Sequence, residues 1–153
     1  MTVLLETIGY SNWILHALVW LPVLGIALVL GTEERKAKTV AFWCSVIVLG
    51  LSLGLWWAFD PTISGFQMES TATWIEAWGV NYSLGTDGIS RFMVMLTTWS
   101  TALAILGSFN YIRVRERAFY ALMLLLEAGV VGVFVATDVF LFYVFFEITL
   151  IPM

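Results

Sequence analysis

Hydrophobic residues fall into long, nearly unbroken runs along this chain. A transmembrane α-helix needs about 20 mostly apolar residues to cross a hydrocarbon core of about 30 Å. A run that begins at Asp138 continues to the last residue, Met153. Four earlier runs meet or approach the required length: Trp13–Leu30, Thr39–Phe59, Ile89–Asn110 and Ala118–Ala136. The pattern predicts an all-α, polytopic membrane protein with four complete transmembrane helices and a truncated fifth.

Charged residues between the runs give the expected orientation. The connection Glu33–Lys38 carries three positive residues, and the connection after the third run carries three arginines. The connection 60–88 carries four acids and neither Lys nor Arg. The positive-inside rule then places both basic connections in the cytoplasm and the N-terminus and acidic loop outside. Arg91 is the exception, just inside the third run, where its side chain can extend outward to the interface.

Composition excludes several classes of protein. Of the 153 residues, 61% are hydrophobic and only 12% are charged, and the mean hydropathy is +0.93. These values exclude a disordered segment, a disulfide-rich secreted module and an ordinary cytosolic enzyme. The net charge of −4 argues against a nucleic-acid partner. The single cysteine, Cys44, can form no internal disulfide. The first 34 residues contain no Lys or Arg, so we expect the first run to be a membrane span and not a cleaved signal peptide.

The outer connection 60–88 is too long for a simple link between helices. Tyr82 and Leu84 alternate with polar residues ahead of Gly85, which suggests a short strand and turn at the membrane surface. Asp87 precedes the third run and is expected to cap that helix by accepting hydrogen bonds from its free backbone N–H groups.

Small residues recur at four-residue spacing in two of the runs. Such stripes let helix backbones approach closely in lipid, although glycine and alanine are also simply common in membrane helices. In both interpretations these are packing positions and not chemical groups. The stripes are Gly50, Gly54 and Ala58, and Ala128, Gly132 and Ala136.

Two acids, Glu127 and Glu147, interrupt the apolar runs. Each lies nine positions from one end of its run, or about 13 Å along a helix, so both are expected near the middle of the bilayer. An ionised carboxylate there costs about 2.5–3.5 kcal/mol even on lenient insertion scales. This cost favours groups that exchange protons, although a protonated glutamate that hydrogen-bonds a neighbouring helix is the structural alternative. Tyr143, one turn before Glu147, is placed to hydrogen-bond it.

Other polar residues carry weaker signals. His16, near the outer end of the first run, is typical of an interfacial hydrogen-bonding residue more than of a proton relay. Asp138 is expected first to cap the fifth helix and only second to release protons. No cofactor or metal motif is evident. No run contains a lysine, so a cation for Glu147 must come from outside these 153 residues, and the transport hypothesis requires Glu147 to lie in an enclosed polar environment.

The segment 122–153, LMLLLEAGVVGVFVATDVFLFYVFFEITLIPM, strongly resembles the fourth and fifth helices of the antiporter-like subunits of respiratory complex I, of the M-chain or subunit 4 type. Residues 82–90 resemble the outer-loop signature before their third helix. The resemblance implies the N-terminal part of a fourteen-helix subunit. Residues 1–117 would form a three-helix region with the outer loop 60–88, and residues 118–153 would begin the first proton-channel repeat.

The resemblance also implies a function. In such subunits the fifth-helix glutamate, which matches Glu147, pairs with a lysine on the seventh helix, and Glu127 falls on the same hydrophilic axis. The chain would belong to a proton-translocating membrane-arm subunit of NADH–quinone oxidoreductase in a bacterial cytoplasmic membrane, and would contact lipid, other membrane-arm subunits and neighbouring antiporter-like chains. It would hold no redox cofactor, with flavin and iron–sulfur clusters in partner subunits. The alternatives are a subunit of a multisubunit cation/proton antiporter or membrane-bound hydrogenase, and a small membrane scaffold protein.

Overall fold

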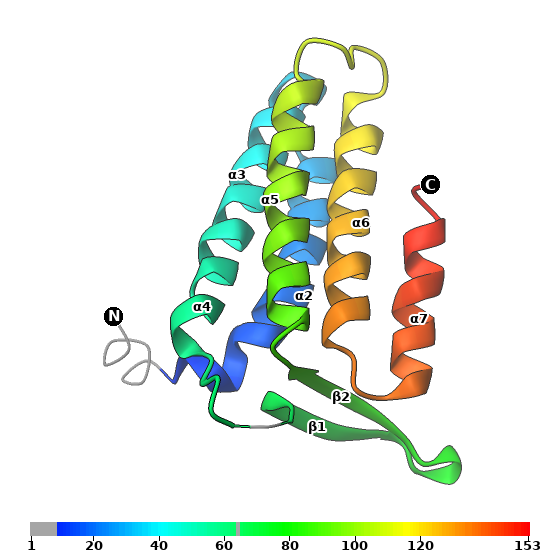
Figure 1. Cartoon of the computed structure of the whole chain (residues 1–153). Helices are drawn as coiled ribbons and strands as arrows, with labels where there is room; N and C mark the ends of the chain where they lie inside the picture. Colours follow the sequence, from blue (N-terminus) through cyan, green and yellow to red (C-terminus); the bar gives the residue numbers. More distant parts are fainter. Residues whose placement is uncertain (1–8, 64) are drawn as a thin grey trace.

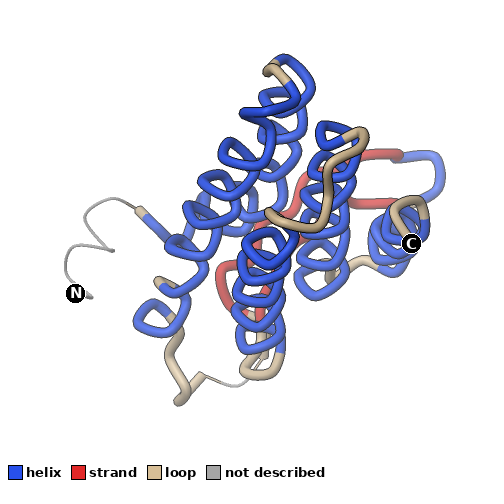
Figure 2. Tube along the Cα trace, turned by 90° about the horizontal axis from the view of Figure 1, so that it is seen from above, coloured by secondary structure: helices blue, strands red, loops and turns tan. Residues whose placement is uncertain are grey.

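The computed structural model describes residues 9–63 and 65–153, and each of the five predicted runs is mostly helical, with Thr39–Phe59 divided between two helices. Four long helices run side by side and α7 lies beside α6, as Figure 1 shows from the side and Figure 2 from above. The helices are α2 (Tyr10–Gly31), α3 (Glu34–Leu53), α4 (Leu55–Ala58), α5 (Ser90–Ser108), α6 (Glu116–Val135) and α7 (Val139–Leu150). Between α4 and α5 lie the strands β1 (Gln67–Ile75) and β2 (Val80–Thr86), with the short 3-10 helix η1 (Glu76–Trp78) between them.

Three of the described helices are long and apolar enough to cross a membrane: α2, α3 together with α4, and α6. The sequence predicted four complete spans, so the count differs by one. The exception is α5, whose 19 residues would suffice in length. It carries Arg91 and a series of serine and threonine residues, which lower its mean hydropathy. α7 is apolar but has only 12 residues.

The two ends of the bundle differ in charge and in structure. The α2–α3 turn and the α5–α6 loop lie together at the end opposite the β-hairpin (Figure 1). These two connections and the helix ends beside them contain Arg35, Arg113 and the other basic residues that the sequence assigned to one side. The helices therefore place both basic connections at one end of the bundle and the acidic connection at the other end, as the alternating charge pattern predicted.

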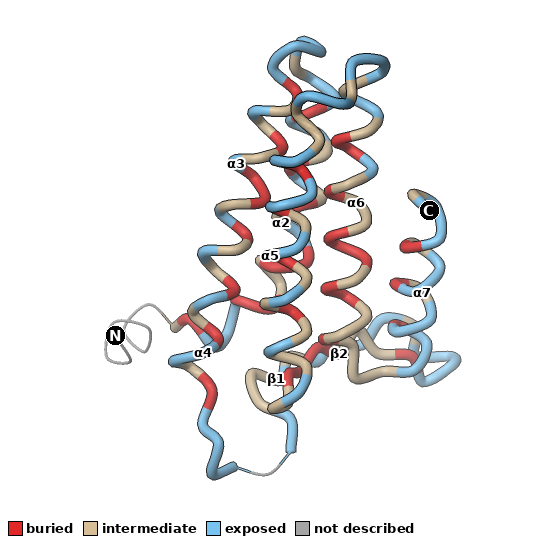
Figure 3. Tube along the Cα trace, turned by 45° about the horizontal axis from the view of Figure 1, so that its top comes forward, coloured by how far each residue is buried: buried red, intermediate tan, exposed pale blue. Residues whose placement is uncertain are grey.

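The core lies between the helices, and the outward faces are apolar as well. Buried residues follow the inward side of each long helix in Figure 3. The outward side exposes large aromatic side chains, among them Trp20, Trp43 and Trp99, each more than half exposed. Because water would penalise such a surface, the bundle is built to be surrounded by lipid or by further apolar helices.

Two strands form an antiparallel hairpin across the end of the bundle (Figure 1). Its register pairs Ser70 with Leu84 and Thr73 with Asn81, with irregularities near Met68 and near the turn. Met68 has a positive φ of 57°, which marks the local break in pairing. The strand predicted around Tyr82 is confirmed, but it belongs to a longer hairpin whose first strand the sequence did not predict.

The hairpin is joined to the turn between α6 and α7. Leu84 forms an isolated antiparallel bridge with Ala136. The backbone N–H of Thr137 donates to the Ser83 carbonyl at 3.0 Å, and the Thr137 hydroxyl donates to the Ser83 hydroxyl at 2.7 Å. These bonds tie the start of α7 to β2.

Glycines mark two close helix contacts. A Cβ at Gly132 would overlap the ring of Phe145 on α7, and a Cβ at Gly54 would overlap the Tyr10 ring of α2. Gly50, in contrast, has no neighbour within 4 Å of such a Cβ. The stripes predicted from sequence are therefore packing positions at Gly132 and Gly54 but not at Gly50. Gly129, outside either predicted stripe, also packs closely, with the methyl carbon of Thr149 at 2.8 Å from the Cβ position.

Candidate functional site

Glu127 is completely buried at the middle of α6. The Ser45 hydroxyl, on α3, donates to its Oε1 at 3.4 Å. Its Oε2 is buried without a hydrogen-bond partner among the described residues. One of the two carboxyl oxygens is therefore buried between helices without a hydrogen bond. Burial of an unpaired polar atom lowers the stability of the fold, which would be a cost without benefit if the group had no function.

A cavity of about 320 Å³ between α5 and α6 reaches Glu127. Its α5 wall carries Thr97 and Thr101, whose hydroxyls donate to the carbonyls of Met93 at 2.7 Å and Thr97 at 3.0 Å. Each hydroxyl donates along its own helix, so its lone pairs remain free to accept hydrogen bonds. The space beside Glu127 is therefore lined by acceptors as well as by apolar side chains, and it is large enough to hold water.

A second buried polar contact joins α3 to α5. The hydroxyls of Ser52 on α3 and Thr98 on α5 are 2.8 Å apart, and both residues are fully buried. Ser52 is seven residues after Ser45, so the two serines lie on the same face of α3. Sequence reasoning missed Ser45, Ser52 and Thr98. The detectable signal was the seven-residue spacing of hydroxyls in an apolar run, which is typical of polar contacts between membrane helices.

Glu147 lies on the exposed side of α7. The buried side of this helix carries Leu141, Phe145 and Thr149, which are four residues apart and face α6. Tyr143 lies one turn before Glu147 on the same exposed side, close enough for the two side chains to interact. Glu147 thus points away from α6, and the two acids do not meet.

The two acids nevertheless lie at similar depth. Gly132 packs against Phe145 and Gly129 against Thr149, so Glu147 is level with residues 130 and 131 of α6. Glu127 lies three or four residues before this level on α6, or about 5–6 Å away at 1.5 Å per residue. Both carboxyl groups are therefore close to the middle of the bundle's length, as their positions in the runs predicted.

The described residues do not enclose Glu147 in a polar environment, although the transport hypothesis requires one. Across residues 9–63 and 65–153, the ion pairs are Lys36 with Glu33 at 3.1 Å and Arg117 with Glu34 at 3.7 Å. Both pairs lie at the basic end of the bundle and neither involves Glu147. Within the described residues, Glu147 therefore has no ion-pair partner.

The secondary candidates have structural roles at the hairpin end. The His16 Nε2 lies 2.9 Å from the Ser70 hydroxyl, and its ring stacks on Tyr82 with the centroids 5.6 Å apart. Asp138 caps α7 by accepting from the N–H groups of Phe140 at 2.9 Å and Leu141 at 3.2 Å. Both match the first role that the sequence suggested for them: interfacial hydrogen bonding and helix capping.

Asp87 also caps a helix as predicted. Its Oδ1 accepts from the N–H groups of Ile89 at 2.9 Å and Ser90 at 2.6 Å, at the start of α5. The hydrogen bond from the Ser90 N–H is the main reason why the pKa of Asp87 lies below its usual range. As for metal sites, no cluster of three or more His, Cys, Asp or Glu occurs in the described part of the chain.

Apolar helices with large exposed aromatics and a buried mid-helix carboxyl define a multi-pass membrane protein. Residues 15–131 match the family model described as NADH-ubiquinone oxidoreductase chain 4, amino terminus. The chain belongs to this family. The match begins well before the motifs that carried the resemblance, so it also includes the first two helices.

Individual relatives agree with the family. The chain is 43% identical over 120 residues to NADH-quinone oxidoreductase subunit M of Rhodobacter capsulatus, covering 78% of this chain and 23% of the relative. It is 37% identical over 142 residues to NAD(P)H-quinone oxidoreductase chain 4 3 of Picosynechococcus sp., covering 90% of this chain and 26% of the relative. F(420)H(2) dehydrogenase subunit M of Methanosarcina mazei is 36% identical over 120 residues, which are 78% of this chain and 24% of that protein. The chain thus spans about a quarter of the length of these relatives.

A solved structure has the same fold. The Mrp complex from Dietzia sp. DQ12-45-1b contains a chain that matches 93% of this one with a TM-score of 0.73. The sequence identity is 21%, and the match covers 15% of that chain. The helical arrangement of this chain is therefore shared with a chain of that complex.

Proposed function

We propose that this chain provides the N-terminal helices of a proton-translocating, membrane-arm subunit of an NADH–quinone oxidoreductase. The main observation behind this proposal is that Glu127 is a fully buried carboxyl group at the middle of a helix, in a member of the chain 4 family. The subunit couples quinone reduction to proton movement and performs no redox chemistry itself. Flavin and iron–sulfur clusters belong to partner subunits, and other membrane-arm subunits, including neighbouring antiporter-like chains, flank this one.

The two acids have different parts in this proposal. Glu127 borders a cavity that is partly lined by hydroxyls, and in this proposal water that enters the cavity exchanges a proton with the carboxyl group while Ser45 donates to one of its oxygens. Glu147 and Tyr143 lie on the exposed side of α7, where the remainder of the full-length protein supplies their cover and a cation. A change in the pairing of Glu147 then changes its attraction for a proton, which is an electrostatic mechanism of coupling.

The orientation is part of the proposal. The basic connections lie at one end of the bundle and the hairpin at the other, and the positive-inside rule assigns the basic end to the cytoplasm. The N-terminus and the hairpin are then outside, and the membrane is the bacterial cytoplasmic membrane. We also propose that residue 118 begins the first proton-channel repeat, after an N-terminal region of residues 1–117.

The test uses the full-length protein in its complex, in inverted membrane vesicles. Glu147→Gln and Glu127→Gln keep side-chain size but cannot ionise. Each should lower proton pumping, followed by quenching of a pH-sensitive dye, together with the rate of quinone reduction. Glu76→Gln, in the exposed hairpin turn, is the matched control and should leave both rates unchanged.

The same variants separate transport from a purely structural role. The amide oxygen introduced by Glu127→Gln can still accept the hydrogen bond from Ser45, so a structural role alone predicts wild-type rates for this variant. If Glu147→Gln keeps quinone reduction and pumping fully coupled at the control rates, its assigned role is wrong.

A second candidate function is that of a subunit in a multisubunit cation/proton antiporter or membrane-bound hydrogenase. This second candidate is consistent with the fold shared with the Mrp complex and with the similarity to an F(420)H(2) dehydrogenase subunit. Copurification of the full-length protein with flavin- and iron–sulfur-containing chains supports the oxidoreductase, and their absence supports the antiporter. The small-scaffold hypothesis has no support in these comparisons.

A further inference from the structure

Arg91 is the one basic residue that departs from the charge pattern of the connections. It lies in the first turn of α5, at the hairpin end of the bundle. Its guanidinium carbon is 4.3 Å from the ring centroid of Phe59, 4.7 Å from that of Phe92 and 5.7 Å from that of Trp56. Its Nε is buried without a hydrogen-bond partner in the part of the chain that the structure describes. Aromatic faces stabilise the positive charge, and among the described residues no hydrogen bond uses the terminal N–H donors of the guanidinium, which leaves them available for an anion.

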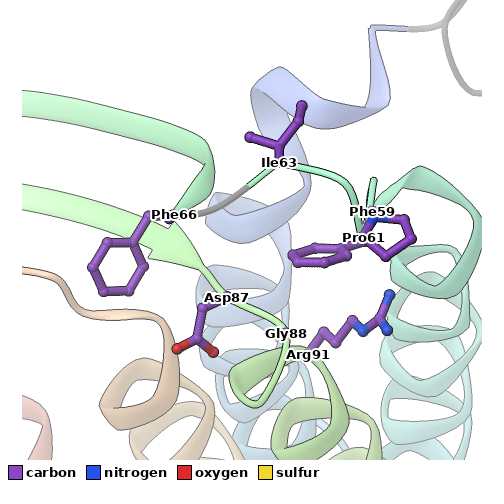
Figure 4. A pocket seen from close by; sticks show the side chains of 8 residues that line it. Phe59, Pro61, Ile63, Phe66, Asp87, Gly88 and Arg91 are labelled. Carbon is purple, nitrogen blue, oxygen red and sulfur yellow. The ribbon is translucent and has the colours of Figure 1, made fainter.

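A cavity of about 390 Å³ opens beside this arginine. Figure 4 shows its walls, with Phe59, Pro61, Ile63 and Phe66 as apolar side chains. The volume falls within the range of about 300–1,000 Å³ that is typical of sites for small ligands. Asp87 and Arg91 both line it, so one cavity contains groups of opposite charge.

These two groups do not neutralise each other. Asp87 and Arg91 are four residues apart at the start of α5, a spacing at which opposite charges commonly pair. Figure 4 shows the Arg91 side chain directed toward Phe59 and Pro61, away from the Asp87 carboxylate. The lowered pKa of Asp87 keeps its carboxylate ionised at neutral pH. A ligand that carries both a positive and a negative group would therefore find a complementary partner for each.

The surroundings of the cavity indicate what kind of ligand this is. Trp56 and Trp57, at the end of the apolar α3–α4 segment, are 52% and 47% exposed, as is typical of residues at a membrane–water interface. Ile63 and Phe66, which line the cavity, are also about half exposed. A charged cavity with an apolar border at this depth suits an amphiphile more than a soluble metabolite.

We propose that this cavity binds the headgroup of an aminophospholipid, with the phosphodiester at Arg91 and the primary ammonium at Asp87. The exposed apolar side chains at its border would contact the acyl chains. An anionic lipid without an ammonium group could use Arg91 but would be repelled by Asp87. The site is separate from Glu127 and Glu147, so the proposal does not depend on proton transport.

The test measures lipid binding to the delipidated full-length protein by native mass spectrometry, with phosphatidylethanolamine and phosphatidylglycerol as probes. Wild type should bind phosphatidylethanolamine more tightly than phosphatidylglycerol. Arg91→Gln should weaken phosphatidylethanolamine binding by about tenfold, the loss expected for one charge-assisted contact of about 1.4 kcal/mol. Arg113→Gln, at the opposite end of the bundle, is the matched control and should bind as wild type.

Asp87→Asn separates headgroup recognition from folding. Asparagine caps a helix about as well as aspartate does, so α5 should remain folded. The variant should lose the preference for phosphatidylethanolamine over phosphatidylglycerol. Equal binding of both lipids by wild type, or unchanged binding by Arg91→Gln, would overturn the proposal. Competition by inorganic phosphate at the same concentration as the lipid would overturn the assignment to a lipid.

Discussion

Replacing Gly132 by alanine should force α7 away from α6. A methyl group at this position overlaps ring carbons of Phe145, which is buried against α6. Overpacking of this kind costs about 1–3 kcal/mol. Alanine returns up to about 1 kcal/mol through its higher helix propensity, so the net loss of stability is about 0–3 kcal/mol. Gly50→Ala is the matched control, because nothing lies within 4 Å of the new methyl group. It should gain about 0.5–1 kcal/mol.

The measurement is thermal or denaturant-induced unfolding of the full-length protein in detergent, with both variants compared in the same conditions. Phe145→Leu removes the ring that Gly132→Ala would meet, so the double variant should lose less stability than the sum of the two single changes. Equal shifts of the unfolding temperature for Gly132→Ala and Gly50→Ala would refute the reasoning, since they would show that the Phe145 contact exerts no constraint.

Three further predictions concern the hairpin end of the molecule. Asp138→Ala should lower the unfolding free energy by about 1 kcal/mol through loss of a helix cap, whereas Asp138→Asn should not, as compared by thermal unfolding. Hydrogen bonds lower the folded-state pKa of Asp87 and of Asp60, the latter chiefly through Thr62. Their contribution to stability is therefore complete above the ordinary carboxyl pKa of about 3.9 and is lost as the pH falls through the lower folded-state values. Titration of these two groups should therefore not change the unfolding temperature between about pH 5 and pH 8. A fall in the unfolding temperature within that range, if Asp87→Asn abolished it, would contradict the lowered pKa of Asp87. His16→Ala should free the hairpin from α2 at a cost of about 1 kcal/mol, seen as faster proteolysis within residues 67–86, and an unchanged cleavage rate would show that its contact with Ser70 is not stabilising.

The helices could be predicted closely from sequence because each is specified by its own apolar residues. The predicted run Ala118–Ala136 and the observed Glu116–Val135 differ by two residues or fewer at each end. In lipid, a backbone must satisfy its hydrogen bonds within the segment, so an apolar run has few alternatives to a helix. The transmembrane count was less accurate, since the hydroxyl-rich Ser90–Ser108 is long enough but less apolar than its neighbours.

The hairpin and the surroundings of the acids were harder to predict because they depend on residues far apart in sequence. Gln67–Ile75 is rich in polar residues and becomes a strand only by pairing with β2. Ser45 meets Glu127 from 82 positions away, a contact that no local pattern encodes. Glu147 is exposed because α7 buries Phe145 and Thr149 against the glycines of α6. Which face of α7 packs on α6 therefore decides where the Glu147 side chain points, and the sequence of α7 alone does not specify that face.

The junction of the hairpin with the α6–α7 turn has a mechanical consequence. The bonds from Thr137 to Ser83 fasten the residues just before α7 to a surface element, and Glu147 follows about ten residues later, or about 15 Å along the helix axis. A helix of this length is stiff, so the height of the Glu147 carboxyl in the bilayer is set by where the hairpin rests. A displacement of the hairpin along the membrane normal would be transmitted to this acid as an axial displacement of similar size.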